Sequence, residues 1–334
     1  MVPDCSKILV TGATGFIGRH LAPVLTAQGA VVRGASRLVP ASGIPGVAEW
    51  TVVGGLGPDT DWTKALGGVG TVVHLAALAH QTDPRRQPRE AEFMTVNAAG
   101  TTRLAEAARA AGVRRFIFVS SIGAVAEASD DLVDETTPSR PSSAYGRSKL
   151  AAEAALRAVF EGSKVEWCVL RPVLVYGPGN PGNMARLHRL VHSGLPLPLG
   201  GIRNHRSFLF VGNLVSAIAR LTKAPSVSGR TFHVADDKIV STPELIQLIA
   251  LAAGRRVVLW PAPRWSLQAA ARCGDIAAGC GLRTGLDSYS LLRLEQSLIV
   301  SSQALRQVTG WRPERTLLEG LRITFRTSLS PNGP

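Results

Sequence analysis

The chain has 334 residues, which is enough for two ordinary domains or for one large α/β domain with an appended lobe. Hydrophobic residues make up 45% and charged residues 18%, so the composition is that of a globular chain with a sizeable core. The formal net charge of +13 comes almost entirely from arginine, but these arginines are dispersed rather than grouped with aromatic residues, which argues against a nucleic-acid partner. They are either scattered solvated side chains or, in part, ligands for a polyanion, since a guanidinium group grips phosphate at two points.

The start of the chain carries no export signal. Residues 1–7 lack a basic segment followed by an apolar stretch, and no run of the chain approaches the ~18 apolar residues that span a bilayer. We therefore expect a cytoplasmic protein with no membrane insertion. The cysteines show neither a Cys-x-x-Cys pair nor metal-ligand spacing, so we expect neither a disulfide framework nor a metal site; they are Cys5, Cys168, Cys273 and Cys280.

Strands and helices alternate along the first half of the chain. Apolar runs predict strands at 7–11, 31–36, 71–76, 116–120 and 165–171, with helical segments between them. This alternation predicts parallel βαβ units and a doubly wound α/β sheet of the Rossmann type.

We place a dinucleotide-binding domain at residues 1–176. Residues 177–334, which are denser in glycine and proline, are assigned mostly to a smaller C-terminal α/β substrate lobe, with some elements returning to the Rossmann domain. The alanine-rich segment 264–281 is predicted to be a packed helix rather than a membrane anchor, because it lacks a Lys/Arg-rich polar face.

A glycine-rich turn follows the first predicted strand. Gly12 allows the tight turn, Gly15 lets the backbone approach a pyrophosphate, and Gly18 lets the next helix meet the strand closely. The helix begins at about Phe16 and Ile17, and its free N–H groups and positive dipole end favour phosphate. A strand before the loop and a helix after it favour dinucleotide binding over a turn without a ligand.

The end of the second strand bears on the choice of cofactor. Residues 33–37 read RGASR and contain no carboxylate that would bind a ribose 2′-hydroxyl. Ser36 and Arg37 therefore favour NADP(H), with NAD(H) as the alternative if Arg37 stacks only on the adenine.

Tyr145 and Lys149 have the i,i+4 spacing that places both side chains on one face of a helix. A free tyrosine has a pKa of ~10, and a nearby ammonium group together with the positive nicotinamide ring of a bound cofactor would lower it toward the working range of a proton carrier. Ser121 follows the strand at 116–120, at the edge where doubly wound sheets bind ligands, and its hydroxyl is placed to hold a substrate oxygen. Ser120 is the neighbouring alternative.

Further motifs accompany these groups over nearly the whole chain. They include HLAA at 74–77, VNAAGT around Asn97, the Pro-x-x-Pro spacer before YGRSK, RPVLVYGPG at 171–179, and the later segments LPLPLGGIRNHRSFLFVGNL and GWRP. Together with the glycine loop and the Ser/Tyr/Lys set, they resemble the extended short-chain dehydrogenase/reductase family of nucleotide-sugar epimerases, dehydratases and ketoreductases. The resemblance implies a nicotinamide dinucleotide and a nucleotide-sugar substrate.

The resemblance also implies roles for single residues. Those that would line the dinucleotide are Leu75, Ala76, Ala77, Asn97 and Pro172, the last beside the nicotinamide. Asn183 and Arg206 would contact the UDP part of a sugar nucleotide, and Arg293 would be a second pyrophosphate ligand. For the two arginines the alternative is a solvated or structural side chain.

The chain also departs from the family pattern. Leu174 stands where many relatives have an asparagine, Gly55 removes a carboxylate near the adenine, and Gly212 replaces an aspartate. Residues 121–123 read SIG, without the acid pair that drives water elimination, which argues against 4,6-dehydratase chemistry.

Within the family, the chain is most similar to bacterial 4-ketoreductases that form UDP-N-acetylquinovosamine from a UDP-4-keto-6-deoxy-N-acetylhexosamine. The resulting hypothesis is C4 reduction by NADPH, with Tyr145 donating the proton, Lys149 holding the ribose and Ser121 orienting the ketone. The alternatives are a UDP-hexose 4-epimerase and, in a different class, a non-catalytic NADP-binding regulator. Alanine-rich segments at 98–111 and 149–159 predict close helix pairing, and family members commonly form homodimers through these helices.

Overall fold

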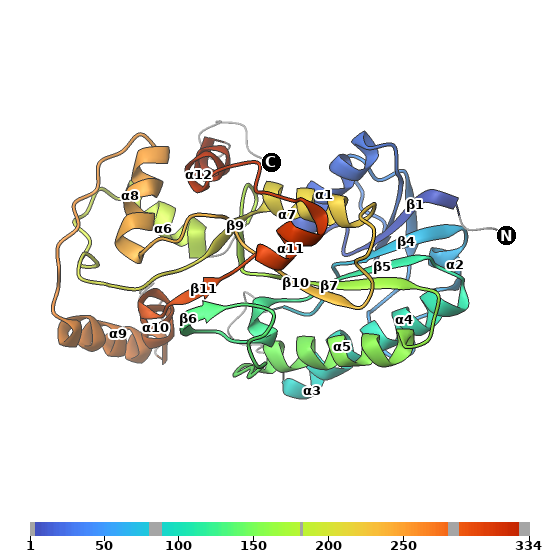
Figure 1. Ribbon diagram of the computed structural model, residues 1–334. Coiled ribbons are helices and arrows are strands. Elements are labelled where there is room, and N and C mark those ends of the chain that lie inside the picture. Colours follow the sequence, from blue (N-terminus) through green and yellow to red (C-terminus); the bar gives the residue numbers. More distant parts are fainter. Residues whose placement is uncertain (1–3, 80–88, 181–182, 280–286, 327–334) are drawn as a thin grey trace.

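The computed structural model describes residues 4–79, 89–180, 183–279 and 287–326 (Figure 1). Seven strands form one parallel sheet in the order β10-β7-β5-β4-β1-β2-β3. The strands are β1 (Asp4–Thr11), β2 (Val31–Ser36), β3 (Glu49–Val52), β4 (Val69–His74), β5 (Arg115–Val119), β7 (Glu166–Pro172) and β10 (Arg230–Val234). The chain leaves β1 on one side toward β2 and β3, then returns to β4 on the other side. The expected doubly wound Rossmann sheet is therefore confirmed, with its switch point between β1 and β4.

Helices cover both faces of this sheet (Figure 1). On one face α1 (Phe16–Ala27) packs against α7 (Val211–Leu221), and on the other α4 (Gly100–Ala110) packs against α5 (Ala144–Phe160). Strands buried on both faces need apolar side chains at successive positions, and β4 is buried along its whole length. The core is accordingly divided into two clusters, one on each side of the sheet.

The helical segment between the strands predicted at 71–76 and 116–120 is interrupted. A short helix, α3 (Glu90–Phe93), passes through one wide π-type turn over Met94–Ala99 before α4 begins. Asn97 lies in that turn, and π-type turns are frequent at functional sites.

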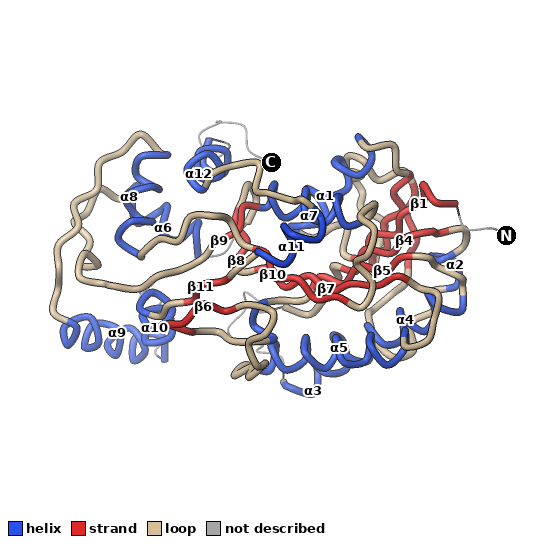
Figure 2. Tube along the Cα trace, viewed as in Figure 1, coloured by secondary structure: helices blue, strands red, loops and turns tan. Residues whose placement is uncertain are grey.

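The second lobe is mainly helical, as Figure 2 shows at the left of the view. Its helices are α6 (Asn183–His192), α8 (Thr242–Ala252), α9 (Arg264–Gly279), α10 (Ser288–Glu295) and α12 (Leu317–Arg326). Two small parallel sheets join it to the Rossmann domain: β8 (Leu174–Tyr176) with β9 (Phe208–Phe210), and β6 (Ser129–Val133) with β11 (Leu298–Val300). The chain passes between the Rossmann domain and the second lobe more than once, because α7 and β10 belong to the Rossmann layers and β6 pairs with the late strand β11.

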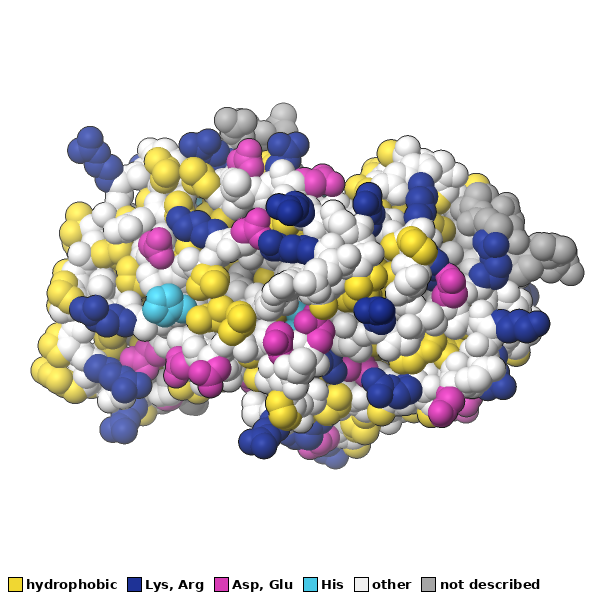
Figure 3. Space-filling model, viewed as in Figure 1, with side chains coloured by type: hydrophobic (Ala, Val, Ile, Leu, Met, Phe, Trp, Pro, Cys, Tyr) yellow, Lys and Arg dark blue, Asp and Glu magenta, His cyan; other side chains and the backbone are white. Residues whose placement is uncertain are grey.

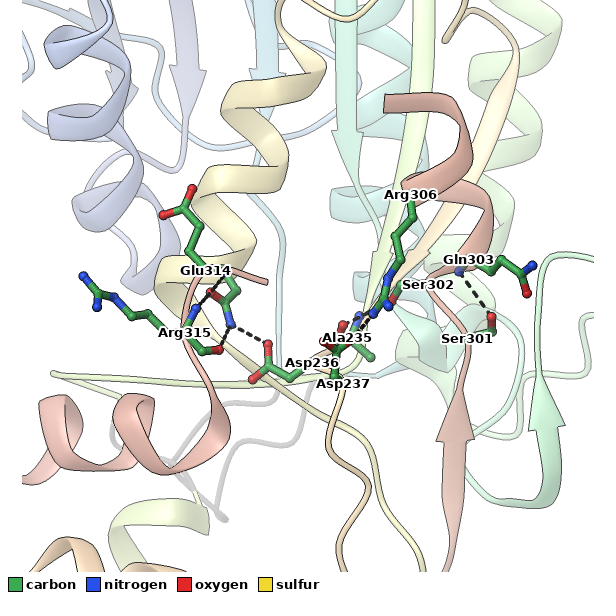
Figure 4. Close-up of polar contacts among 10 residues, drawn as sticks. Ala235, Asp236, Asp237, Ser301, Ser302, Gln303, Arg306, Glu314 and Arg315 are labelled. Carbon is green, nitrogen blue, oxygen red and sulfur yellow. Dashed lines mark hydrogen bonds and ion pairs between the residues drawn. The ribbon is translucent and has the colours of Figure 1, made fainter. Parts of the chain in front are cut away.

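The end of β10 is tied to late segments of the chain (Figure 4). Ser302 accepts a hydrogen bond from the Ala235 amide at 2.7 Å, and Arg306 of α11 (Gln303–Thr309) forms an ion pair with Asp237. Asp236 accepts from Asn213 Nδ2 at 2.7 Å, and burial raises its pKa to about 6. These contacts place the carboxyl end of β10 against α7 and α11.

The glycine at position 212, where relatives have an aspartate, is explained by local packing. A Cβ there would lie 2.5 Å from the ring of Phe210. Asn213 next to it makes the contacts of this junction, because its Oδ1 accepts from the amides of Glu314 and Arg315, both at 3.0 Å. The departure therefore leaves the junction intact.

Candidate active site

The turn between β1 and α1 is built from glycines at positions where a side chain would not fit. Gly12 has φ +69°, and a Cβ there would lie 2.9 Å from the Ala76 amide nitrogen. A Cβ on Gly18 would lie 2.4 Å from the carbonyl oxygen of Gly12, so α1 meets β1 at backbone distance. The turn is thus closed tightly between β1, α1 and the segment after β4.

The N-terminus of α1 lacks a capping side chain. Gly15 is the N-cap residue in an extended conformation, and the first turn, which starts with the half-buried Phe16 and Ile17, contains no acid. The amides of a helix's first turn have no partner within the helix and stand at the positive end of its dipole. This turn is therefore suited to bind an anionic group such as a pyrophosphate.

A threonine–histidine–threonine chain fixes the segment after β4. Thr11 Oγ1 lies 2.6 Å from His74 Nδ1, and His74 Nε2 lies 2.9 Å from Thr101 Oγ1. Thr11 Oγ1 also accepts from the amides of Leu75 and Ala76, at 3.2 and 3.1 Å. Burial lowers the pKa of His74 to about 3, so the ring is neutral and acts as a structural bridge.

Asn97 is buried and its amide is engaged with the protein. Its Oδ1 accepts from the Leu78 amide at 2.7 Å, and its Nδ2 donates to Leu78 O at 2.9 Å and to Ser148 Oγ at 3.0 Å. These contacts hold the segment after β4 against α5. The half-buried Ala77 lies in the same segment.

The end of β2 presents one hydroxyl and one exposed arginine. Ser36 donates its hydroxyl to Leu38 O at 2.6 Å, whereas the side chain of Arg37 is exposed. Arg33 turns elsewhere, since its guanidinium bonds Glu49 Oε2 at 2.8 Å and Ala65 O at 2.9 Å. Of the two arginines in this stretch, only Arg37 is therefore open to solvent at the strand end.

Ser121 and Tyr145 lie on segments that meet at two glycines. A Cβ on Gly146 would be 2.2 Å from the carbonyl oxygen of Gly123, so α5 touches the turn that carries Ser121. Ser121 Oγ accepts from the Gly123 amide at 3.1 Å and remains half-buried. The motifs in the sequence did not single out Gly146 as a site residue, although a glycine directly after the tyrosine indicates that another backbone segment approaches closely.

Lys149 is almost fully buried at 2% exposure, and Tyr145 is half-buried beside it. The lysine Nζ donates to Val119 O at 2.9 Å and lies 4.6 Å from the ring centroid of Phe118 and 6.0 Å from that of Tyr145. Burial lowers the pKa of Lys149 to about 8, and the negative charge of Glu153 opposes that shift.

In the chain without its cofactor, Lys149 alone does not lower the pKa of the phenol. Burial raises the pKa of Tyr145 to about 12. Removal from water dominates for the phenol, since the Lys149 ammonium donates to the Val119 carbonyl and lies 6.0 Å from the centroid of the tyrosine ring. In the chain alone, Tyr145 is a neutral hydroxyl at pH 7.

Ser120 faces a buried ionic network that the sequence did not reveal. Its hydroxyl donates to Glu153 Oε1 at 2.5 Å, and Arg171 binds the same carboxylate through Nε at 3.0 Å and Nη2 at 2.5 Å. Arg171 Nη1 lies 3.5 Å from His233 Nε2. Ser120 is thus engaged in a buried network, whereas Ser121 is half-buried and outside that network. Pro172, next to Arg171, is buried at the end of β7.

An apolar pocket with three arginines in its wall lies in the second lobe. Its volume is about 90 Å³, and the apolar lining includes Leu174, Met184, Leu187, Phe208 and Leu245. The arginines are Arg186, Arg206 and Arg293. Asn183 is the first residue of α6, and its side chain lies outside the described part of the structure.

Arg206 is a buried cation without an acidic partner among the residues that the structure describes. It is 8% exposed, and its Nη1 donates to the carbonyl oxygens of Arg293 at 2.6 Å and Gln296 at 3.3 Å. Burial and the nearby charge of Arg293 lower its pKa to about 10, so it stays charged at pH 7. Arg293 itself lies 4.0 Å from Glu127. Two converging guanidinium groups with so little acidic compensation favour an anionic ligand.

Neither a membrane span nor a metal cluster occurs within the described residues. None of their helices is long and apolar enough to cross a membrane. They hold no cluster of three or more potential metal ligands, and Cys168 and Cys273 are free thiols. Cys5 and Cys280 lie outside the part whose side chains are described.

Comparison with known proteins gives a consistent result. Residues 8–235 match the model of the NAD dependent epimerase/dehydratase family. A UDP-glucose 4-epimerase of Vibrio cholerae is 34% identical over 330 residues, covering 98% of this chain and 96% of that protein. Two solved structures superpose along the whole chain: MoeE5 in complex with UDP-glucuronic acid and NAD (27% identity, TM-score 0.73, 96% and 98% covered) and the Thermus thermophilus UDP-glucose 4-epimerase complex with NAD (26%, 0.70, 98% and 100%).

The expected family is thereby confirmed, whereas the expected special likeness to 4-ketoreductases finds no support in these relatives. The chain matches the family model over most of its length. It carries the glycine turn between β1 and α1, the Tyr145–Lys149 pair and the arginine-lined pocket. The chain belongs to the NAD dependent epimerase/dehydratase family of enzymes.

Proposed function

We propose that this enzyme interconverts the C4 epimers of a UDP-hexose, with NAD retained between turnovers. The observation that carries the proposal is the presence of three features in one chain: the open N-terminus of α1, the pair of Tyr145 with the buried Lys149, and the pocket with Arg206 and Arg293. These are the parts that a dinucleotide and a sugar nucleotide meeting at the tyrosine would need. The epimerase relative over nearly the full length of the chain supports this choice among the reactions of the family.

The dinucleotide fits residues that are already in place. The amides at the start of α1 would take the pyrophosphate, because the glycines leave no side chain in its way. Leu75, Ala76 and Ala77 would border the dinucleotide, with Pro172 near the nicotinamide. We assign Asn97 a positioning role, since its amide is occupied by Leu78 and Ser148. When bound, the cofactor supplies the hydride acceptor for C4 and returns the hydride later.

Tyr145 would remove the proton from the C4 hydroxyl and return it after the sugar has turned. Ionising a phenol of pKa about 12 at pH 7 costs ~7 kcal/mol, so the buried hydroxyl is inert until further positive charge enters the cleft. Lys149, still mostly protonated at pH 7, would turn its ammonium toward phenol and ribose, and Ser121 would hold the C4 oxygen. This requirement couples proton transfer to cofactor binding.

Arg206 and Arg293 would bind the diphosphate of the substrate. A guanidinium fork donates hydrogen bonds to two phosphate oxygens at once, and burial increases the strength of that contact. The apolar part of the same pocket, whose volume is about 90 Å³, is large enough for the base alone. The sugar would then extend out of the pocket toward Ser121 and Tyr145. We propose that Asn183 adds a contact from the start of α6.

The second candidate is C4 reduction of a UDP-4-keto-6-deoxy-hexosamine by NADPH. It is favoured by one observation, the absence of a carboxylate at the end of β2, where Arg37 is exposed. We nevertheless place NAD(H) first, because the solved relatives carry NAD. Titration of the purified protein with NAD⁺ and NADP⁺ tests this assignment, and tighter NADP⁺ binding that Arg37→Ala abolishes would reverse it.

The deciding experiment incubates the purified enzyme with UDP-glucose and, separately, with UDP-N-acetylglucosamine. Formation of the C4 epimer by NMR without net change in absorbance at 340 nm is the expected result. Stoichiometric NADPH oxidation with a 4-keto sugar nucleotide, and no epimer, would replace the proposal by the reductase. Tyr145→Phe should lower the rate by a factor of about 10²–10⁴. A Tyr145→Phe variant with full biological activity would instead indicate a non-catalytic regulator.

We also propose a homodimer through α4 and α5. The two helices lie side by side on one face of the sheet, and α5 exposes the small side chains of Ala154 and Ala158. Small residues allow helices of two subunits to approach closely. Sedimentation of the wild type against Ala154→Glu, which places a charge in that face, tests the proposal.

A further inference from the structure

One end of the second lobe exposes large apolar side chains among arginines. We call this region the lobe-tip surface; its exposed apolar members are Leu195 (65%), Val258 (63%), Trp260 (46%), Trp265 (72%) and Ile276 (70%), and its arginines are Arg255, Arg256, Arg264 and Arg272. Figure 3 shows hydrophobic side chains along the left edge of the molecule with Lys and Arg side chains among them, where Figure 1 places α8, the connection to α9, and α9 itself.

Backbone contacts join these residues into one surface. The amide of Leu197 donates to Val258 O at 2.9 Å, and the amide of Trp260 donates to Leu197 O at 3.1 Å. The segment after Leu195 therefore lies against the extended stretch that leads into α9. Val258 and Trp260 are two residues apart on that stretch and point to the same side, while Leu259 between them packs toward the core.

Helix α9 packs against the rest of the second lobe through one side. Leu267 and Ala271 are buried at 5% and 1%, and the helix packs on α10. Trp265, Arg272 and Ile276 are seven and four residues apart, which places them together on the opposite side of the helix. The packed helix expected at 264–281 is thus present up to residue 279, but its outer face exposes two large apolar side chains, Trp265 and Ile276, beside Arg272.

The charge of this region is strongly positive. Residues 254–279 contain four arginines and one aspartate. Arg264 pairs with Glu295 at 3.0 Å, and Asp275 accepts from the Ser288 amide at 3.0 Å. Within the described residues, Arg255, Arg256 and Arg272 have no ion pair. An occupant of this surface must therefore supply negative charge as well as an apolar phase.

We propose that the lobe-tip surface docks on an anionic phospholipid bilayer. Tryptophan combines an apolar ring with an N–H donor and prefers the boundary between lipid tails and water. Arginine can lay its stem along apolar material while its guanidinium group binds lipid phosphate. Helix α9 by itself lacks the Lys/Arg-rich face of a membrane anchor, but Arg255 and Arg256 of the preceding segment add to Arg272, so the lobe-tip surface as a whole combines apolar side chains with arginines, as interfacial binding requires. Because α9 packs on α10, which carries Arg293, docking brings the arginine-walled pocket toward the bilayer.

Tryptophan fluorescence gives a selective test. Three of the six tryptophans, Trp62, Trp167 and Trp311, are buried at 2–7% exposure, and Trp50 is half-buried. Only Trp260 and Trp265 would enter a lipid phase. Full-length protein is titrated with vesicles of phosphatidylcholine alone and of phosphatidylcholine with phosphatidylglycerol, followed by flotation. We expect flotation and a blue shift of the emission with the anionic vesicles only, and reversal at high salt.

Variants locate the contact. An arginine near an anionic surface contributes roughly a factor of five to binding, so Arg272→Gln should weaken vesicle binding about fivefold, and Arg255→Gln with Arg256→Gln about 25-fold. Trp265→Ser should remove most of the blue shift. Matched controls outside the surface are Val52→Ser, at an apolar residue that is 53% exposed, and Arg230→Gln, and neither should change binding.

Three outcomes would overturn the proposal. The first is equal or absent binding to the two kinds of vesicle. The second is an equal loss of binding in the control variants. The third is self-association in sedimentation that depends on Trp265 and occurs without vesicle binding, which would make the surface an interface between copies of the chain. None of these measurements depends on the proposed enzymatic activity.

Discussion

The buried pair of Glu153 and Arg171 allows a quantitative prediction. The two residues are 7% and 8% exposed, and the carboxylate receives bonds from Arg171 Nε and Nη2 as well as from Ser120. Glu153→Gln keeps the shape of the side chain but removes its charge. It leaves the guanidinium group buried, with the imidazole of His233 3.5 Å from Nη1 and the charge of Glu135 acting without an ion-pair contact. Breaking a buried pair in this way costs about 3–5 kcal/mol.

Urea unfolding followed by circular dichroism measures that loss. With a slope of ~3 kcal/mol per molar urea for a chain of this size, the midpoint should fall by about 1–1.7 M. The matched control is Glu166→Gln, because Glu166 also pairs with an arginine, Arg115, but is 52% exposed. Exposed pairs contribute about 0–1 kcal/mol. A Glu153→Gln midpoint within the range of this control would refute the reasoning.

The same substitution has a second expected effect that packing alone would not produce. The negative charge of Glu153 raises the pKa of Lys149 against the effect of burial. Its removal should move the ionisation of Lys149 below pH 8, and the alkaline limb of the pH–rate profile should move with it. An unchanged profile in a folded Glu153→Gln protein would mean that the lysine does not sense this carboxylate.

Three further predictions concern other parts of the chain. Gly18→Ala should abolish dinucleotide binding and lower the melting temperature, since its Cβ would lie 2.4 Å from a carbonyl oxygen; Gly67→Ala, whose Cβ would meet no atom closer than 3.8 Å at a residue of negative φ, is the control in a thermal-shift titration with NAD⁺. Arg206→Lys should raise KM for the sugar nucleotide with little change in kcat, because lysine loses the two-point grip, and a lowered kcat at unchanged KM would contradict a binding role. The pKa of Asp236 is raised from 3.8 to about 6 in the folded chain, so the folded state keeps its proton while the unfolded state loses it. The free energy of unfolding should therefore fall by ~2 kcal/mol from pH 4 to pH 6 relative to Asp236→Asn, whereas Asp130→Asn, at an exposed residue away from this junction, should follow the wild type.

Local rules explain what the sequence alone determined. Alternating apolar runs and helical segments predicted the parallel sheet, because the periodicity of a strand or a helix is set by its own residues. The glycine turn could be found in the same way, since the demand for backbone space at Gly12 and Gly18 arises within a short stretch. The common helix face of Tyr145 and Lys149 follows directly from 3.6 residues per turn.

Long-range neighbours decided the rest. Burial raised the pKa of Tyr145 instead of lowering it, and desolvation depends on every element that packs around a group. Ser120 and Ser121 are indistinguishable in sequence, and only the position of Glu153 on another element turned one of them inward. The sequence also did not show that the outer face of α9 is exposed, because an amphipathic pattern indicates which residues share a face but not whether another element covers that face.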